Sequence, residues 1–334
     1  MASNRVLGES YVCETMNEVY HCVLLDLLER SEFTCSPRDM KIKENLFVNI
    51  TLQNPRARLI TSKIRKVNYG FATGEFLWYY AGKNDLATML YYNKRMKDFS
   101  DDGLTLNSAY GHRIFTEKYY KAESNGETIF ETTQWLAVVN TLLDDNDSRR
   151  AVITINQPKD VANASMIGSK DVPCTLSLQF FIRKNRLHLH VLLRSNDVWW
   201  GLPYDVFSFT LLQEIMLKTL QTSGLKSLKL GEYHHSAGSI HLYERDWKTA
   251  RNVVTELDHV IRGCYPEAMQ KYGSCVMNSL CGVWDLNDMM SIEKGLREGL
   301  VHHASSANFR GAAKWMIKQL NDHRSKRDKE ENKK

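Results

Sequence analysis

The stretch Asp171–Phe209, DVPCTLSLQFFIRKNRLHLHVLLRSNDVWWGLPYDVFSF, joins two strand-like runs to a cluster of polar residues. The runs Thr175–Arg183 and Arg186–Ser195 mix apolar and polar side chains over a strand's length, which favours β-strands. Lys184-Asn185 between them predicts a two-residue hairpin turn. We therefore expect a β-hairpin that forms the floor of an active site, with the rest of the chain built around it.

A cysteine and an arginine meet at the open end of this hairpin. In the predicted register Cys174 faces Ser195, and Arg194 lies beside it. A nearby cation lowers the pKa of a thiol and so favours the nucleophilic thiolate. A lone cysteine can equally be a small buried hydrophobe. The neighbouring Arg194 favours the interpretation of Cys174 as a nucleophile.

Composition limits the class of protein. The 334 residues are 43% hydrophobic and 25% charged, which is typical of a soluble globular protein with a full core. The net charge of +5 suits a small anionic substrate better than an obligate nucleic-acid partner. Seven scattered cysteines without a C-x-x-C pair argue against a disulfide framework or zinc ribbon. With no apolar leader at the N-terminus and no spanning run, we predict a cytoplasmic protein.

Periodicity predicts the remaining elements. Apolar residues recur at helical spacing on one face, or alternate as in a half-buried strand, in separate segments. These predict helices over 11–30, 66–81 (ending at Gly82) and 127–144, a strand over 46–52, and a strand, loop and strand over 226–243. The pattern indicates one α/β or α+β domain over 1–320 with a mixed or antiparallel sheet, and a charged, disordered tail over 321–334.

Several polar residues have two interpretations. Glu75 lies inside an apolar helix, where it is either a paired or solvated group or a catalytic one. Arg149 and Arg150 precede a strand and are either solvated or bound to a phosphate. Asp205 opens a helical run and could simply be its N-cap.

Two features could suggest a metal. Asp101-Asp102-Gly103 is better interpreted as a turn, because no further ligand follows at loop spacing. His234 and His235 lack a cysteine or carboxylate at matching spacing. We therefore predict no metal cofactor.

Taken together, the motifs of residues 10–247 resemble the thymidylate synthase family. The closer likeness is to its cytosine-directed branch, the phage deoxycytidylate hydroxymethylases and related cytidylate hydroxymethylases. The resemblance implies a single thymidylate-synthase-like domain, with a mixed twisted sheet and flanking helices, that works as a homodimer.

The resemblance assigns four catalytic residues. GEFLWYY looks like the helix that carries the family's catalytic glutamate, which implies Glu75. LNSAYG is similar to the segment with the active-site tyrosine, here Tyr110. PCTLSLQFF resembles the strand that carries the family's nucleophile, which implies Cys174. RSNDVWWGLPYDV resembles the family's longest signature, which implies that Asp205 contacts the pyrimidine base of the substrate.

It also implies binding residues. Arg38 falls where the family has its phosphate-loop arginine, and DSRRAVI resembles the arginine pair that reaches the partner subunit's phosphate. The implied nucleotide-binding residues are Arg38, Arg149, Arg150, Arg194, Ser195, Asp205 and, from GSIHLY, the sugar contacts His241 and Tyr243. The implied folate-binding residues are Asp197, Trp200, Gly201 and Tyr204.

The chemistry that follows from the resemblance is one-carbon transfer. Cys174 adds to C6 of a pyrimidine and makes C5 nucleophilic. C5 takes a methylene unit from 5,10-methylenetetrahydrofolate, while Glu75 and ordered water move protons. Hydride transfer to the resulting exocyclic methylene gives a methyl group, and addition of water gives a hydroxymethyl group.

Asp205 selects the base in this interpretation. Thymidylate synthases carry an asparagine there, whereas an aspartate accepts from N4 of cytosine and, when protonated, donates to N3. Thr175 also follows the cytosine branch. We expect 5-hydroxymethylation of a cytidine monophosphate, with dCMP favoured and CMP possible.

Departures from the family pattern affect the product. Met96 stands where the family has a tryptophan beside the folate, and Leu193 replaces a frequent glutamine. The chain also does not end in the short apolar tail that covers folate in the synthases, and extends instead into a helical and basic segment. Water exclusion favours hydride transfer, so Met96 and the missing apolar tail both favour water addition. The alternatives are a dCMP 5-methyltransferase, a dUMP-directed thymidylate synthase or hydroxymethylase, and a non-catalytic nucleic-acid-binding relative.

Overall fold

The computed structural model describes residues 7–124, 127–262, 274–280 and 284–332. The strands are β1 (Ser10–Cys13), β2 (Phe33–Cys35), β3 (Ile42–Leu52), β4 (Lys118–Ser124), β5 (Glu127–Thr133), β6 (Val152–Thr154), β7 (Thr175–Arg183), β8 (Arg186–Leu193), β9 (Asn196–Asp197) and β10 (Lys229–Tyr243). The helices are α1 (Met16–Arg30), α2 (Tyr69–Tyr80), α3 (Leu86–Tyr92), α4 (Tyr110–Phe115), α5 (Gln134–Asp144), α6 (Pro158–Met166), α7 (Leu202–Thr222), α8 (Trp247–Arg262), α10 (Trp284–Arg297) and α11 (Gly311–Glu331).

One mixed sheet organises the chain. Its strands follow the order β1-β3-β10-β8-β7-β6, with β2 paired to β3 and β9 to β10. β10 runs parallel to β8 and antiparallel to β3, while β7 and β8 are antiparallel. The predicted hairpin is confirmed: Lys184 and Asn185 have φ of 49° and 56°, the positive values of a type I′ turn.

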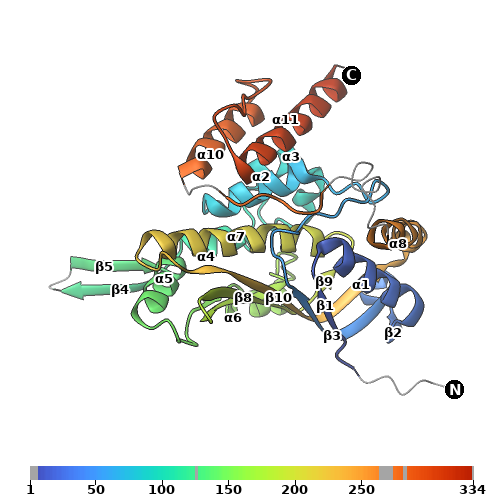
Figure 1. Ribbon diagram of the computed structural model, residues 1–334, viewed down its shortest axis with the longest axis horizontal. Helices are drawn as coiled ribbons and strands as arrows, with labels where there is room; N and C mark the ends of the chain where they lie inside the picture. Colours follow the sequence, from blue (N-terminus) through green and yellow to red (C-terminus); the bar gives the residue numbers. More distant parts are fainter. Residues whose placement is uncertain (1–6, 125–126, 263–273, 281–283, 333–334) are drawn as a thin grey trace.

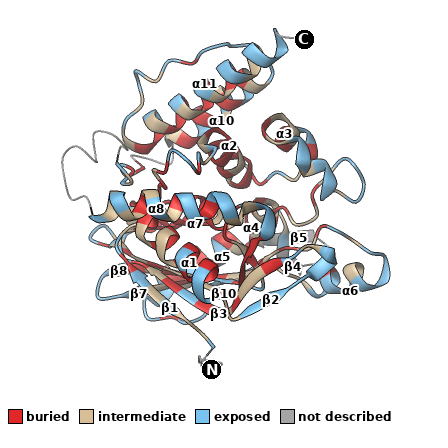
Figure 2. Cartoon of the chain, turned by 90° about the vertical axis from the view of Figure 1, so that its right-hand side faces the viewer, coloured by how far each residue is buried: buried red, intermediate tan, exposed pale blue. Residues whose placement is uncertain are grey.

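Helix α7 covers the centre of the sheet (Figure 1). It is buried along nearly its whole length, and the amide of Gln213 donates to the carbonyl of Leu187 in the sheet at 2.9 Å. Alternate residues of β8 and β10 therefore face helices and are buried. The intervening ones, such as His188 and His234, lie on the opposite face and stay half-buried. Figure 2 shows α1, α7 and α8 gathered on the same side of the strands.

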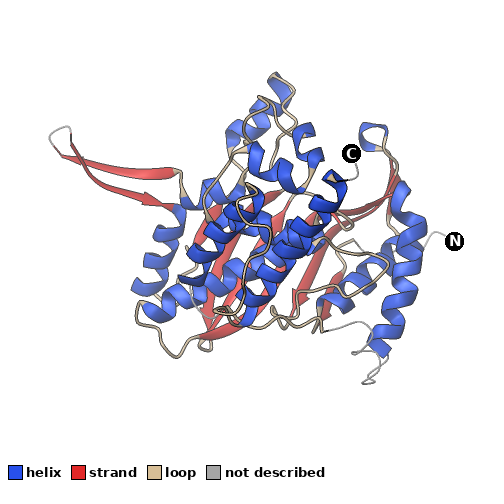
Figure 3. Ribbon diagram, turned by 90° about the horizontal axis from the view of Figure 1, so that it is seen from above, coloured by secondary structure: helices blue, strands red, loops and turns tan. Residues whose placement is uncertain are grey.

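Two sequence predictions about local structure were wrong. The expected helix over 127–144 is strand β5 followed by α5, which begins after Thr133; the hydroxyl of Thr133 accepts from Leu136 N at 3.4 Å. The run ETIFETT is rich in β-branched residues, and it pairs with β4 in a hairpin that projects from the body (Figure 3). The expected strand, loop and strand over 226–243 is one long strand, β10, with an irregularity between Leu230 and Tyr233.

The predicted disordered tail was also wrong where the structure describes it. Residues 321–331 belong to α11, which packs on α2 together with α10 (Figure 1). Charge density predicted disorder, but Asn321 and Arg324 are buried. The Arg324–Asp328 pair at 2.8 Å adds a contact at helical spacing. Lys333 and Lys334 lie outside the described residues.

Within the described parts of the chain, no helix combines the length and apolarity needed to cross a bilayer. The described cysteines, Cys13, Cys22, Cys35, Cys174 and Cys275, are free thiols.

Candidate active site

Cys174 lies immediately before β7, beside Arg194 from the end of β8. The pairing shifts by one residue between Thr175 and Ser177, so Cys174 lies opposite Arg194 instead of Ser195 as predicted, and its carbonyl accepts from Arg194 N at 2.9 Å. The guanidinium also donates to the carbonyls of Val172 and Pro173, each at 3.0 Å. These bonds hold Arg194 Nη2 at 3.8 Å from the sulfur.

The electrostatics of Cys174 differ from the sequence expectation. Burial raises the pKa of the thiol, and the charges of Arg194 and Arg38 only partly offset this effect. Asp205 raises the same pKa further. The thiol is therefore protonated at neutral pH in the free protein, because the cost of desolvating a thiolate exceeds the attraction of the two arginines.

Two acidic groups converge from different helices. Burial, with a smaller contribution from the charge of Asp205, raises the pKa of Glu75 on α2 to about 8, although a hydrogen bond from Tyr79 lowers it in part. Burial likewise raises the pKa of Asp205 to about 7, against a hydrogen bond from Asn196. Both groups can gain or lose a proton near neutral pH, which general acid–base catalysis requires. Asp205 lies in the first turn of α7, whose N-cap is Gly201, so the N-cap interpretation of Asp205 was wrong.

Sequence reasoning missed the residues that hold Asp205. Its Oδ2 accepts from Nδ2 of Asn196 at 2.7 Å, and Oδ1 of Asn196 lies 3.2 Å from Nε2 of His235. Nδ1 of His235 lies 2.9 Å from the hydroxyl of Tyr233. The signal was the polar Asn196 directly after Ser195, but only the pairing of β9 with β10 brings it to His235.

Tyr110 closes another side of the site at the start of α4. Its hydroxyl accepts from Thr175 N at 3.4 Å, and its ring stacks on Phe209 with centroids 6.1 Å apart. Tyr79 lies against it at 5.5 Å. A side chain at Gly111 would collide with the backbone of Tyr79, so glycine allows α4 to approach α2 and sets the position of Tyr110.

The four predicted phosphate arginines fall into two groups. Arg38 is exposed in a short 3-10 turn with φ of 53°, and its charge lowers the pKa of both Cys174 and His241. Arg38 and Arg194 therefore act at the thiol. Arg149 is exposed, and its carbonyl accepts from Gln179, five residues along β7 from Cys174, or roughly 16 Å. Arg150 is exposed beside it, so the chain does not bring this pair to its own Cys174.

The predicted sugar contacts lie at the end of β10. His241 and Tyr243 have ring centroids 5.3 Å apart and are mostly buried. Burial lowers the pKa of His241 to about 4, so its imidazole is neutral. Among the residues that the structure describes, Nδ1 of His241 is a buried polar atom without a hydrogen-bond partner. A ligand hydroxyl would satisfy it.

The predicted folate residues lie between β9 and α7. Burial raises the pKa of Asp197 to about 6, although its Oδ1 accepts from Trp199 N at 2.7 Å. A Cβ on Gly201 would lie 2.9 Å from the Asp197 carbonyl, so only glycine fits the turn. Trp200 is 45% exposed and offers a ring surface, whereas Tyr204 is buried and its hydroxyl accepts from Asn68 N at 3.3 Å. Met96 is half-buried in the 3-10 segment Lys94–Asp98.

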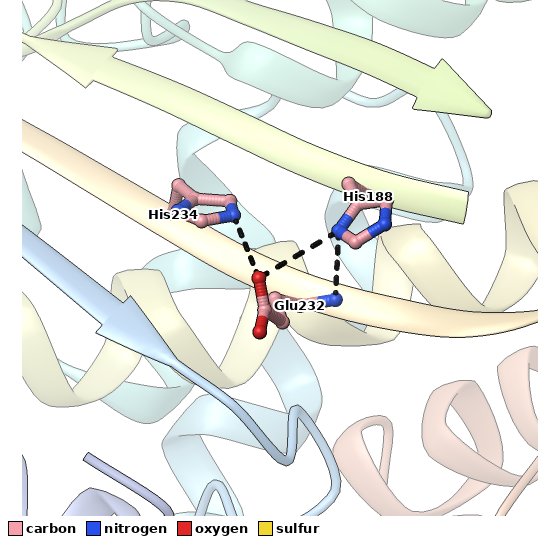
Figure 4. A group of neighbouring side chains, drawn as sticks. All are labelled: His188, Glu232 and His234. Carbon is pink, nitrogen blue, oxygen red and sulfur yellow. Dashed lines mark hydrogen bonds and ion pairs between the residues drawn. The ribbon is translucent and has the colours of Figure 1, made fainter. Parts of the chain in front are cut away.

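The metal interpretations have separate outcomes. Asp102 accepts from the backbone of Leu104 and Thr105, as expected of a turn. His234, however, lies near His188 and Glu232, with one potential ligand atom from each within 4.8 Å of the others (Figure 4). Glu232 lies two residues before His234 on the same strand, a carboxylate that sequence reasoning overlooked. His188 is 46 positions away, and the pairing of β8 with β10 brings it close. It lies on the sheet face opposite His235 and does not contribute to the site around Asp205.

Comparisons with known proteins point to one family. The family model described as thymidylate synthase matches residues 35–261. The deoxyuridylate hydroxymethyltransferase of Bacillus phage SP01 is 32% identical over 232 residues, covering 69% of this chain and 57% of the relative. The thymidylate synthase of Bacillus phage phi3T is 29% identical over 193 residues, covering 58% and 63%.

The fold is shared with a solved structure. The thermostable thymidylate synthase A of Bacillus subtilis superposes with a TM-score of 0.55 at 22% identity, covering 72% of this chain and 83% of that protein. The chain spans little more than half the length of the phage hydroxymethyltransferase. The chain belongs to the thymidylate synthase family, and its mixed sheet with flanking helices is the fold of that family.

Proposed function

We propose that the protein 5-hydroxymethylates a cytidine monophosphate, with dCMP favoured and CMP possible, using 5,10-methylenetetrahydrofolate. The observation that carries the proposal is Asp205, a carboxyl group at the base-reading position with a pKa of about 7. An ionised carboxylate accepts from N4–H of cytosine and has no hydrogen to donate to O4 of uracil, as the asparagine amide of the synthases does. A neutral carboxyl can accept from N4–H and donate to N3. The neutral form of Asp205 can therefore pair with both N3 and N4–H of cytosine, whereas the ionised form pairs with N4–H alone.

The proposed chemistry begins at Cys174. Its thiol proton passes to water, Sγ bonds to C6, and the π-electron pair of the C5–C6 bond moves to C5, which becomes the nucleophile. Arg194 and Arg38 face the thiol, and a nucleotide phosphate bound there would remain close to the reacting base. Glu75, with its pKa near 8, is suited to move protons on the ring and to help remove the C5 proton.

The folate supplies the one-carbon unit at the oxidation level of formaldehyde. Addition of water gives a hydroxymethyl group without redox change, whereas a methyl group needs a hydride. Met96 at the family's tryptophan position supports water addition, because a thin flexible side chain shields the reacting carbon less than an indole does. Reverse elimination of Cys174 from C6 then releases the product.

A homodimer is part of the proposal. Arg149 and Arg150 are exposed and roughly 16 Å or more along the sheet from their own Cys174, so they suit the phosphate of a partner subunit. Mixing a Cys174→Ser variant with an Arg149→Ala/Arg150→Ala double variant tests this. Active heterodimers with one intact site are expected, and no gain over the separate variants would contradict the shared site.

The central experiment incubates the protein with dCMP, CMP or dUMP and methylenetetrahydrofolate, followed by mass spectrometry of the nucleotide. We expect a cytosine product heavier by one hydroxymethyl substitution and tetrahydrofolate as the released folate. A methyl product with dihydrofolate would instead identify a dCMP methyltransferase. Cys174→Ser should abolish product, while Cys35→Ser, which changes an exposed thiol, should not. Equal turnover in both variants would contradict the role of Cys174 as the nucleophile. Absence of product from all three nucleotides with the unmodified protein would favour a non-catalytic relative that binds nucleic acid.

The second candidate is a dUMP-directed hydroxymethylase or synthase. It is favoured by the names of the relatives, which include deoxyuridylate hydroxymethyltransferases of Bacillus phage SP01 and Delftia phage PhiW-14. Product from dUMP but from neither cytosine nucleotide would establish this second candidate.

A further inference from the structure

Four side chains form one hydrogen-bonded series that ends at the base-reading carboxyl. It runs from Tyr233 through His235 and Asn196 to Asp205, with donor–acceptor distances of 2.9, 3.2 and 2.7 Å. Tyr233 and His235 are fully buried, and Asn196 is 2% exposed. None of the first three is a residue that the proposed chemistry uses. Such a fully buried polar series is costly unless each member is satisfied.

The series has a direction. Burial lowers the pKa of His235 to about 3, so its ring is neutral and carries one N–H. Burial raises the pKa of Tyr233 well above its ordinary value, so the phenol keeps its proton and donates to Nδ1. His235 Nε2–H then donates to Oδ1 of Asn196, which turns the amide NH₂ toward Oδ2 of Asp205. The reverse orientation of the amide would need a hydrogen on Oδ2 of Asp205, which the ionised form cannot supply, whereas the observed orientation suits the ionised and the neutral form alike.

The direction of these hydrogen bonds matters because a neutral carboxyl group can carry its proton on either oxygen and so does not by itself select one base. Cytosine presents an acceptor at N3 and a donor at N4, while uracil presents a donor at N3 and an acceptor at O4. A neutral aspartic acid can match either edge, and the match depends on which of its two oxygens carries the proton. A base-reading aspartate therefore discriminates only if something fixes its proton.

We infer that Asn196 is a specificity-determining positioning residue, which fixes Oδ2 of Asp205 as an acceptor and confines the proton to Oδ1. The inference rests on the proposed function in that it takes Asp205 to face the base. For cytosine, Oδ1–H donates to N3, and the second lone pair of Oδ2 accepts from N4–H. His235 and Tyr233 act through Asn196 by preventing its amide from rotating.

The test replaces Asn196 by leucine, which has a similar shape but cannot donate. The measurement is the ratio of kcat/KM for dCMP to kcat/KM for dUMP, with both nucleotides in competition and products separated by mass. We expect the ratio to move toward one by roughly tenfold to a hundredfold, the effect of one hydrogen bond to a buried carboxyl. His235→Ala should produce a similar change without touching Asp205, and His235→Gln, which keeps a donor, should restore part of the ratio.

The matched control is Ser208→Ala, which removes a buried hydroxyl from the same helix, one turn beyond Asp205. The ratio of kcat/KM for dCMP to kcat/KM for dUMP in this variant should equal that of the unmodified protein. Thermal unfolding of each variant establishes that it is folded. An Asn196→Leu protein that is folded and loses kcat/KM equally for both bases would overturn the inference, because a merely structural residue does not distinguish bases.

The two proposals fail in different ways. A wild-type preference for dUMP overturns the cytosine assignment. Even then, a ratio of kcat/KM for the two nucleotides that moves toward one in Asn196→Leu supports the role of Asn196. If turnover is absent with every nucleotide, the ratio of the dissociation constants for dCMP and dUMP, measured by calorimetry, gives the same readout. An unchanged ratio of those constants in Asn196→Leu overturns the inference.

Discussion

Replacing Glu75 by glutamine should make the protein less sensitive to alkaline conditions. Burial and the charge of Asp205 raise the pKa of Glu75 to about 8 in the folded protein, from an ordinary value of 4.5 that also applies to the unfolded chain. Between these values the folded state holds a proton that the unfolded state releases. Stability therefore falls as pH rises through this window and becomes constant above about pH 8.

The displacement of the pKa sets an upper limit on the effect. A change from 4.5 to about 8 corresponds to roughly 5 kcal/mol, since each unit is worth about 1.4 kcal/mol. Glu75 is half-buried and interacts with Asp205, so part of the cost is shared between the two acids. We expect Glu75→Gln to gain about 2 kcal/mol over the wild type between pH 5 and pH 8.5.

Urea unfolding at half-unit pH intervals measures this difference directly. Glu14→Gln is a matched control, because it neutralises an exposed glutamate on the same chain. Its stability curve should run parallel to that of the wild type. A parallel curve for Glu75→Gln as well would refute the reasoning, because it would mean that Glu75 is ionised in the folded protein at neutral pH.

Three further substitutions test how the site is supported. Glu214→Gln should destabilise the protein by about 3–5 kcal/mol in urea unfolding, because Glu214 is the buried partner of Arg58; loss of under about 1 kcal/mol would contradict this. Gly111→Ala should cost about 1–3 kcal/mol and displace Tyr110, since the new methyl group meets the backbone of Tyr79; unchanged stability and kcat would argue against this close approach. Met316→Ala on α11 should cost about 2–5 kcal/mol, because Met316 is fully buried; a neutral effect would mean that α11 does not pack on the domain.

Local pattern determined much of the scaffold. The hairpin of β7 and β8 and the helix before Gly82 follow from turn chemistry and helical spacing, which act over a few residues. The pattern left open whether the sheet is mixed or antiparallel, because strand direction depends on pairing between distant segments. The prediction failed over 127–144 and 321–331. In the first segment, pairing of ETIFETT with β4 outweighed an amphipathic helical pattern. In the second, packing of α11 on α2 ordered a highly charged sequence.

For the candidate site, the sequence by itself determined the residue types and their order: a cysteine, a glutamate, an aspartate and a set of arginines within recognisable motifs. Only the tertiary structure decided their electrostatic state. The pairing shift placed Cys174 opposite Arg194, burial raised the pKa of that thiol, and two acids from α2 and α7 came to share one environment. The series from Tyr233 to Asp205 likewise depends on β9 lying beside β10. Desolvation and long-range pairing depend on the whole fold, so no local pattern encodes them.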